Sequence, residues 1–310
     1  GTWTQPPDTT YSIIEPADNN LGVGTDALAS QSTGDENTGI GYKALNKLST
    51  GAYNVAVGSY GLEDTTGSNQ NTAVGVYALQ KNTGSSNTAI GYNALAKNTS
   101  GTKQIAVGHS ALGNITGGNN NIAIGEDAAG DATGGIANIA IGQDSFYKNQ
   151  TGQNNVSIGT TSLYFNIAGS NQVAIGQKAL YNSDGDENIA IGFEALKTLG
   201  SVGSKNIGIG SGAGDAISSG SNNVIIGDWA GTATTANTVI IAAGTTERLK
   251  VDSTGLSING SPFTVPGAFT GDSGSGGTTG LVPAPAAGDS SASKFLKADG
   301  AWEAIQLTTF

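Results

Sequence analysis

The chain contains one histidine and no cysteine, which leaves few side chains able to do nucleophilic or metal chemistry. Without cysteine there is no disulfide framework, no thiolate metal ligand and no thiol nucleophile. The histidine, His109, has no serine or carboxylate at a spacing typical of a catalytic group, so we interpret it as an exposed residue. We therefore predict no enzyme activity, no metal site and no cofactor.

Two acidic clusters offer oxygen atoms to calcium, Glu63-Asp64 and the run from Asp184 to Glu187. Neither has the spacing of an EF-hand loop or the nonapeptide Gly-Gly-x-Gly-x-Asp pattern, so we interpret both as solvated turns. The stretch GSGAGDAISSG at 210–220 has the glycines of a phosphate-binding loop. It lacks the Lys-Ser/Thr ending and lies inside a repeat, so we discard that function.

Aromatic residues recur at regular spacing, and a row of rings could stack on the sugar rings of a glycan. Packing of each ring against the next repeat or the next chain is the favoured interpretation, and glycan contact is the weaker one. The residues considered for glycan contact are Tyr42, Tyr60, Tyr77 and Tyr92. A second series, Tyr147, Tyr164 and Tyr181, occurs further along the chain.

The composition indicates an ordered but unusual chain. Of its 310 residues, 49 are glycine and only 12% are charged, which argues against a charge-repelled disordered chain. The net charge is −11 and the acidic and basic residues are scattered, so nucleic acid is a poor partner. The longest apolar runs, such as 239–243, are too short to span a membrane, and we expect no membrane insertion.

A repeat of about 17 residues dominates the sequence, and each copy is marked by a glycine that ends an apolar triplet, as in NTAIGYNAL at 87–95. The twelve intervals between these glycines comprise nine of 17, two of 16 and one of 18 residues. The glycines are Gly24, Gly41, Gly58, Gly75, Gly91, Gly108, Gly125, Gly142, Gly159, Gly176, Gly192, Gly210 and Gly227. Positions within a repeat are counted from this glycine below.

We expect two corners in each repeat. The glycine can take a backbone conformation that a Cβ disfavours, and the asparagine at position −4 can turn the chain and stack on its equivalent in the next repeat. The corner asparagines are Asn37, Asn54, Asn71, Asn87, Asn121, Asn138 and Asn188, and Gln104 and Gln172 replace asparagine in two repeats. The corner glycines are those from Gly41 to Gly192 in the series above.

The triplet before the glycine alternates β-branched, small and β-branched residues, which is the period of a strand. A helix is excluded, because glycine in every repeat would cost it about 1 kcal/mol each time. We predict an all-β protein, a parallel β-solenoid of about 17 residues per coil and about 13 coils. Each coil is expected to hold a strand, a turn, a second short strand and another turn. Stacked at about 4.8 Å, twelve steps would make a rod roughly 60 Å long.

The β-branched residues and the leucine at position +4 are expected to fill the coil. The predicted coil core is Ile90, Leu95, Ile122, Ile124, Ile141, Ile175 and Ile191. The small residue at position −2 would then point outward, where a file of alanines favours the close approach of another chain. The predicted inter-chain interface is Ala56, Ala73, Ala89, Ala106, Ala123, Ala140, Ala174 and Ala190. A thin single roll would be marginal on its own, so we infer a homo-oligomer.

These repeats resemble the head repeats of trimeric autotransporter adhesins, in which an asparagine, a small polar residue and Val-Ala-Ile-Gly recur. NTAIGYNAL at 87–95 and NNNIAIGEDA at 119–128 carry the resemblance, which covers about residues 20 to 244. It implies a left-handed parallel β-roll wound as an intertwined or side-by-side homotrimer. The coils are longer than the adhesin repeat, and longer repeats of this kind look like those of bacteriophage tail fibres.

The end of the chain separates these two relatives. GLVPAPAAGDSSASKFLKADGAWEAI at 280–305 resembles a C-terminal segment of many phage tail fibre proteins, through Val-Pro-x-Pro, Lys-Phe-Leu and Asp-Gly-x-Trp. An adhesin is expected to continue into a heptad stalk and a membrane anchor of four strands, and we find neither pattern. The expected regions are a cap or attachment arm (1–19), the β-roll (20–244), a short β transition (245–266), a Gly/Ser/Pro-rich linker (267–293) and a tail-fibre-like segment (294–310).

The leading functional hypothesis is a structural fibre protein of a phage virion that forms a rigid rod and attaches to the host surface. Its expected location is the virion tail fibre or the extracellular space. Its expected partners are itself, other virion or filament subunits, and a host receptor such as a polysaccharide. The alternative is the head of a bacterial trimeric adhesin or another extracellular filament. A polysaccharide-degrading tailspike ranks lowest, because the repeats place no pair of carboxylates about 5 to 9.5 Å apart.

Overall fold

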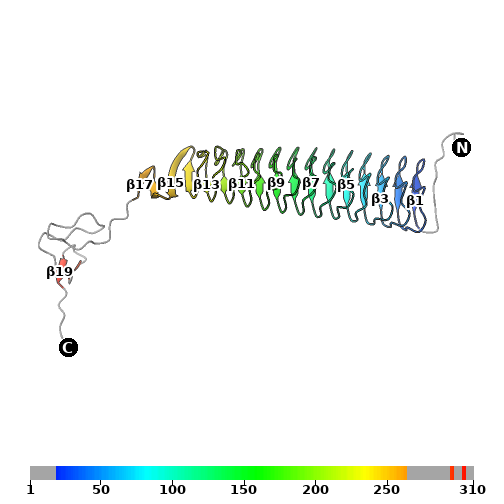
Figure 1. Ribbon diagram of the computed structural model, residues 1–310, viewed down its shortest axis with the longest axis horizontal. Coiled ribbons are helices and arrows are strands. Elements are labelled where there is room, and N and C mark those ends of the chain that lie inside the picture. Colours follow the sequence, from blue (N-terminus) through cyan, green and yellow to red (C-terminus); the bar gives the residue numbers. More distant parts are fainter. Residues whose placement is uncertain (1–18, 264–293, 297–301, 305–310) are drawn as a thin grey trace, which may run out of the picture.

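The computed structural model describes residues 19–263, 294–296 and 302–304, and all regular secondary structure within them is β. Fourteen strands follow one another at intervals close to 17 residues, and each pairs in parallel with the next to build a rod of stacked coils (Figure 1). The predicted parallel β-solenoid is confirmed. The parallel strands are β1 (Leu21–Val23), β2 (Thr38–Ile40), β3 (Val55–Val57), β4 (Thr72–Val74), β5 (Thr88–Ile90), β6 (Ile105–Val107), β7 (Ile122–Ile124), β8 (Ile139–Ile141), β9 (Val156–Ile158), β10 (Val173–Ile175), β11 (Ile189–Ile191), β12 (Ile207–Ile209), β13 (Val224–Ile226) and β14 (Val239–Ala243).

The strands stack in register, so equivalent positions of successive repeats form continuous files along the rod. Ala89 of β5, for example, is paired with Ala73 of β4 and Ala106 of β6. The interval from Gly75 to Gly91 is one residue shorter than the others around it, yet the strands still pair without a shift. Changes in coil length are therefore absorbed in the turns, and the files remain intact.

The second half of each coil is a run of turns, so the prediction of a second short strand is wrong. Positions +2 and +4 have left-handed backbone conformations, with φ of 59° at Asn93 and 52° at Leu95. Such angles are uncommon for leucine and prevent an extended pleat. The turn is still bonded to its neighbours, because Asn93 N–H donates to the Val76 carbonyl (3.0 Å) and Leu95 N–H donates to the Ala111 carbonyl (3.0 Å).

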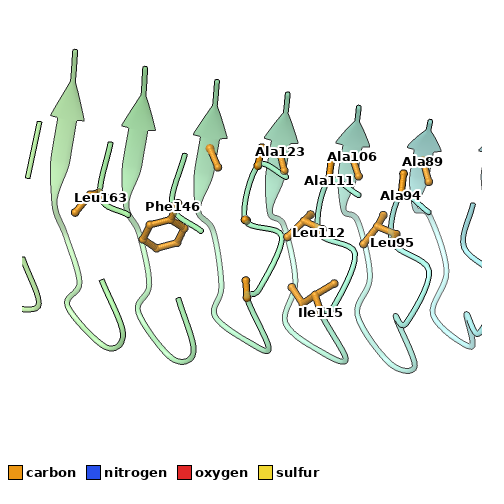
Figure 2. Close-up of a cluster of buried hydrophobic side chains, with 14 of the residues drawn as sticks. Ala89, Ala94, Leu95, Ala106, Ala111, Leu112, Ile115, Ala123, Phe146 and Leu163 are labelled. Carbon is orange, nitrogen blue, oxygen red and sulfur yellow. The ribbon is translucent and has the colours of Figure 1, made fainter. Parts of the chain in front are cut away.

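The interior of each coil is lined by small side chains from two facing segments and a leucine between them. In Figure 2, Ala106 of the strand and Ala111 of the turn segment face one another, with Leu112 beside them. All three are buried. The predicted core position of Leu95 is likewise confirmed, because its side chain is fully buried.

The predicted orientation of the strand is wrong, because its small residue faces inward and its β-branched residues face outward. The alanines assigned to an inter-chain interface are all fully or almost fully buried inside the single chain, so they cannot meet another chain; they are Ala56, Ala73, Ala89, Ala106, Ala123, Ala140, Ala174 and Ala190. The isoleucines assigned to the core are only partly covered; they are Ile90, Ile122, Ile124, Ile141, Ile175 and Ile191.

The physical reason for this reversal is the small distance between the two walls of a coil. A Cβ added at Gly39, which occupies the alanine position of β2, would lie 3.2 Å from the Ala44 carbonyl oxygen and 3.4 Å from the Leu28 side chain. A methyl group fills that space and an isoleucine would not fit beside the leucine. Isoleucine is buried at this position in β13 and β14, as Ile225 and Ile240, and Ile225 lies against Gly214, which replaces the leucine at position +4. The larger side chains of the strand therefore occupy its outer face.

The asparagines at position −4 form a buried ladder along the rod, as their expected stacking requires. Asn54 Nδ2 donates to Asn37 Oδ1 (3.0 Å) and to the Ser68 carbonyl (2.9 Å). Its own Oδ1 accepts from the backbone N–H of Asn71 (3.0 Å) and from Asn71 Nδ2 (3.1 Å). Each side chain thus satisfies polar groups of both neighbouring coils, which allows an amide to be fully buried.

The corner glycine is required by conformation and by close approach. Gly91 has a φ of 137°, and a Cβ there would lie 2.3 Å from the carbonyl oxygen of Gly108 in the next coil. A second glycine file, about ten residues later in most repeats and interrupted by Ser68, was not singled out from the sequence. A Cβ at Gly84 of that file would lie 1.9 Å from the Gly101 carbonyl oxygen, so only hydrogen fits.

The C-terminal end of the parallel sheet is closed by antiparallel strands. β15 (Thr246–Asp252) pairs with β14, β16 (Gly255–Ile258) pairs with β15, and β17 (Ser261–Pro262) pairs with β16. Because β17 has only two residues, little unpaired strand edge is left at this end. Lys294–Leu296 (β18) and Trp302–Ala304 (β19) form a separate antiparallel pair. The linker expected at 267–293 and most of the arm expected at 1–19 lie outside the described residues.

Candidate functional site

The outward residues of the strands form a continuous and predominantly apolar surface, which we call the aliphatic strip. It consists of positions −3 and −1 of β2 to β13. Position −1 contributes Ile40, Val57, Val74, Ile90, Val107, Ile124, Ile141, Ile158, Ile175, Ile191, Ile209 and Ile226. Position −3 contributes Thr38, Val55, Thr72, Thr88, Ile105, Ile122, Ile139, Val156, Val173, Ile189, Ile207 and Val224.

The aliphatic strip is incompletely covered over its whole length. Ile124, near the middle, has 40% of its surface exposed, and the other residues at position −1 are similarly half-exposed. With a coil spacing of about 4.8 Å, the strip runs for roughly 50 Å without a charged residue. An apolar patch of this extent marks an interaction surface in a folded protein, because leaving it in water is unfavourable.

A row of aromatic rings runs beside the strip at positions +1 and +2, and its rings contact one another. Ring centroids are 5.2 Å apart for Tyr42 and Tyr60, 5.0 Å for Tyr60 and Tyr77, and 5.9 Å for Tyr77 and Tyr92. Tyr60 and Tyr77 are stacked, so each covers one face of the other. Burial raises the pKa of Tyr60, with a smaller contribution from the neighbouring tyrosines. Packing against the next coil, the favoured interpretation, is confirmed, and glycan contact gains no support.

The row ends in a cluster of three side chains that could hold a metal ion. Tyr92 stacks on the His109 ring with centroids 5.3 Å apart. In the next coil, Glu126 and Asp127 bring a carboxylate oxygen each to within 4.8 Å of a His109 nitrogen and of one another. The sequence interpretation treated His109 as isolated. The available signal was that Glu126 lies one repeat, 17 residues, after His109 and thus occupies the same position in the next coil.

A third carboxylate, that of Asp144, adds negative charge near Glu126 and Asp127. Burial raises the pKa of Asp144, and the carboxylates of Asp127 and Glu126 raise it further. Within the described part of the chain, no lysine or arginine lies within 4.0 Å of these three carboxylates. Some other carboxylates of the rod are paired with a lysine, as Asp64 is with Lys47 at 2.7 Å.

The two acidic clusters singled out from the sequence have structural partners. Glu63 accepts from Gln80 Nε2 (2.8 Å), beside the Lys47–Asp64 ion pair. Asp184 Oδ1 accepts from the three successive backbone N–H groups of 167–169 in the preceding coil, at 2.5 to 3.0 Å. Both clusters connect the turns of neighbouring coils through hydrogen bonds, in agreement with their interpretation as turns.

A second aromatic series also packs between coils. Tyr147, Tyr164 and Tyr181 stack with centroid distances of 5.2 and 5.4 Å, and Phe165 meets the last two edge to face. Burial raises the pKa of Tyr147 and of Tyr164, and nearby aspartates add to both shifts. These rings stabilise the turns and leave the aliphatic strip as the extended unpartnered surface.

No protein-family model, curated protein or solved structure matches the chain. The structure, over the residues it describes, also has no helix of the length and hydropathy needed to cross a membrane. The aliphatic strip and the rod that carries it are therefore the features from which function can be argued.

Proposed function

We propose that the chain is the subunit of a rigid extracellular fibre, and that copies of it associate through the aliphatic strip. The supporting observation is that strip, which keeps its β-branched residues half-exposed through twelve successive strands. Burying apolar surface contributes about 25 cal/mol for each Å² removed from water. A long straight strip on a long rod is best covered by an equally long partner, and another copy of the same rod has the required length.

The form of the proposed assembly is a homotrimer, with three rods parallel around a common axis and their strips facing inward. The trimeric state and the left-handed coil are part of the proposal, and both rest on the resemblance to adhesin heads. The proposed role is mechanical: the assembly supplies length and stiffness to an appendage that attaches to a host surface. The residues of the repeats are assigned no catalytic part in this proposal.

Within this class, a phage tail fibre is favoured over a bacterial adhesin by the C-terminal segment. Its Lys-Phe-Leu and Trp motifs coincide with β18 and β19, which pair with Phe295 opposite Glu303. The motif residues thus belong to one small folded unit separate from the rod sheet. Antibodies raised against the chain should label appendages of virus particles; labelling of bacterial cell surfaces alone would favour the adhesin alternative.

The decisive test of the assembly is the substitution of a strip residue by arginine. Ile124→Arg should reduce the oligomer to monomer in sedimentation velocity, because it places a charge in an apolar interface. The matched control is Ile136→Arg, since Ile136 has the same 40% exposure but precedes the corner Asn138 and lies outside the strip. It should leave the wild-type oligomer intact. A monomeric wild-type chain, or equal effects of the two substitutions, would refute association through the strip.

A further inference from the structure

We propose that His109, Glu126 and Asp127 bind a divalent transition-metal ion such as zinc, which links two neighbouring coils of the rod. Imidazole nitrogens and carboxylate oxygens both bind zinc, and three protein ligands leave a coordination position for water. The three donor atoms lie within 4.8 Å of one another. Donors bound to one tetrahedral zinc at about 2.0–2.2 Å lie roughly 3.4 Å from each other, so the side chains must rotate to bring the donor atoms closer together.

The backbone holds the ligands in position. Asp127 N–H donates to the His109 carbonyl at 2.9 Å, which fixes the register between the two coils. Stacking on Tyr92, with an angle of 11° between the ring planes, orients the imidazole. Glu126 and Asp127 are adjacent in the chain and belong to the same turn. Only the ends of the side chains need to move when an ion binds.

The local charge favours a cation. Glu126 and Asp127 lie near Asp144, and in the residues described no basic side chain lies within 4.0 Å of any of the three. A divalent ion would offset this repulsion at the centre of the cluster. Asp131, in the same coil, differs in having Lys148 at 3.5 Å and therefore needs no metal.

The donor set also selects the kind of ion. Calcium and magnesium prefer oxygen ligands, whereas zinc, copper, iron and nickel accept an imidazole nitrogen. The whole sequence contains no cysteine and no second histidine. Zinc binding by an untagged chain that depends on imidazole must therefore involve His109.

The test is isothermal titration of the untagged full chain with zinc chloride after treatment with EDTA and dialysis. We expect saturable binding of about one zinc per chain. His109→Ala, Glu126→Gln and Asp127→Asn should each weaken binding at least about tenfold. Asp131→Asn, which removes a carboxylate of the same coil outside the cluster, should retain the wild-type affinity. Magnesium chloride at the same concentrations should not compete.

A second measurement separates ligation from indirect effects. The NMR signals of the single imidazole should shift when zinc is added to wild-type protein and should be unchanged by magnesium. Absence of saturable zinc binding, wild-type affinity in His109→Ala, or an imidazole that does not respond to zinc would each overturn the proposal. Circular dichroism of every variant checks that the β-sheet signal is retained, as expected for substitutions of exposed or half-exposed residues.

Discussion

The inner and outer faces of each strand carry side chains of opposite size. In β7 the inward Ala123 is fully buried, whereas Ile124 beside it leaves 40% of its surface in solvent. Sheets with one solvated face usually have large apolar side chains inward and polar ones outward. Here the coil is too thin for that arrangement, and the leucine at position +4 fills the interior from the opposite wall.

The two faces of each three-residue strand therefore have different roles. The inner face makes the single chain a closed coil, through small residues, leucines and the asparagine ladder. The outer face is apolar without contributing a packed core to the single chain, so it is available to another molecule. Substitutions at neighbouring positions should therefore affect folding in one case and association in the other.

The largest expected effect is on the inner face. Ala123→Arg would place a charge between walls that leave room only for a methyl group, and we expect loss of the folded coils around β7. Burial of an unpaired charge costs several kcal/mol, which is a large part of the stability of a domain. The adjacent Ile124→Arg should retain the β-sheet circular dichroism while losing the oligomer. If both variants fold equally well, our assignment of the inner face is incorrect.

The asparagine ladder should show the next largest effect. Asn54→Ala removes hydrogen bonds to Asn37 and Ser68 and leaves the buried backbone N–H of Asn71 without an acceptor. An unsatisfied buried polar group costs about 1–3 kcal/mol, and urea unfolding should show at least this loss. Asn46→Ala is the matched control, because Asn46 is half-buried and bonded only to the Asp26 carbonyl. It should change stability by about 0.5 kcal/mol or less.

A change in the size of one buried side chain should have a smaller effect on stability. The leucine position is occupied by Ala129 in one coil and by Phe146 in the next, and both side chains are buried. We expect Phe146→Leu to cost about 1–2 kcal/mol by enlarging the space beside Ala129. The double variant Ala129→Leu/Phe146→Leu should recover part of this loss. A double-mutant cycle with coupling below about 0.5 kcal/mol would show that the two sites pack independently.

The smallest effect is expected for a half-buried carboxylate in a turn. Burial, and then Glu194 and Asp228, raise the pKa of Asp215 above its ordinary 3.8. A raised pKa means that the ionised group disfavours folding above that range, whereas the protonated group does not. Asp215→Asn should therefore slightly raise the melting temperature at pH 7, and the gain should disappear below pH 3.8. A gain that persists at pH 3 would point to a cause other than charge.

Much of the architecture could be predicted from spacing. Glycine at intervals near 17 residues indicated the coil, and its φ of 137° at Gly91 agrees with a corner. The asparagine ladder followed from the recurrence of one amide in each repeat. The turn segment was harder to predict, because a left-handed Leu95 contradicts the local preference of leucine and is maintained by burial and hydrogen bonds to adjacent coils.

The candidate sites were less predictable than the coil. A cluster such as His109 with Glu126 needs two residues 17 positions apart to lie side by side, which becomes clear only once the strands are known to stack in register. The aliphatic strip was visible as a pattern but was assigned to the interior. The same residues were identified from the sequence, but they were predicted to point into the coil, whereas in the structure they point outward.

The sequence by itself determined the period, the number of coils, the strand in each coil and the residues of each file, because these depend on spacing along the chain. It could not determine which side of the strand faces inward, because alternation assigns the residues to two faces but does not show which face is buried. The tertiary structure decided this through the distance between strand and turn. From β2 to β12 that distance admits only a small side chain, and so the isoleucines of these strands form a surface for association and not the core.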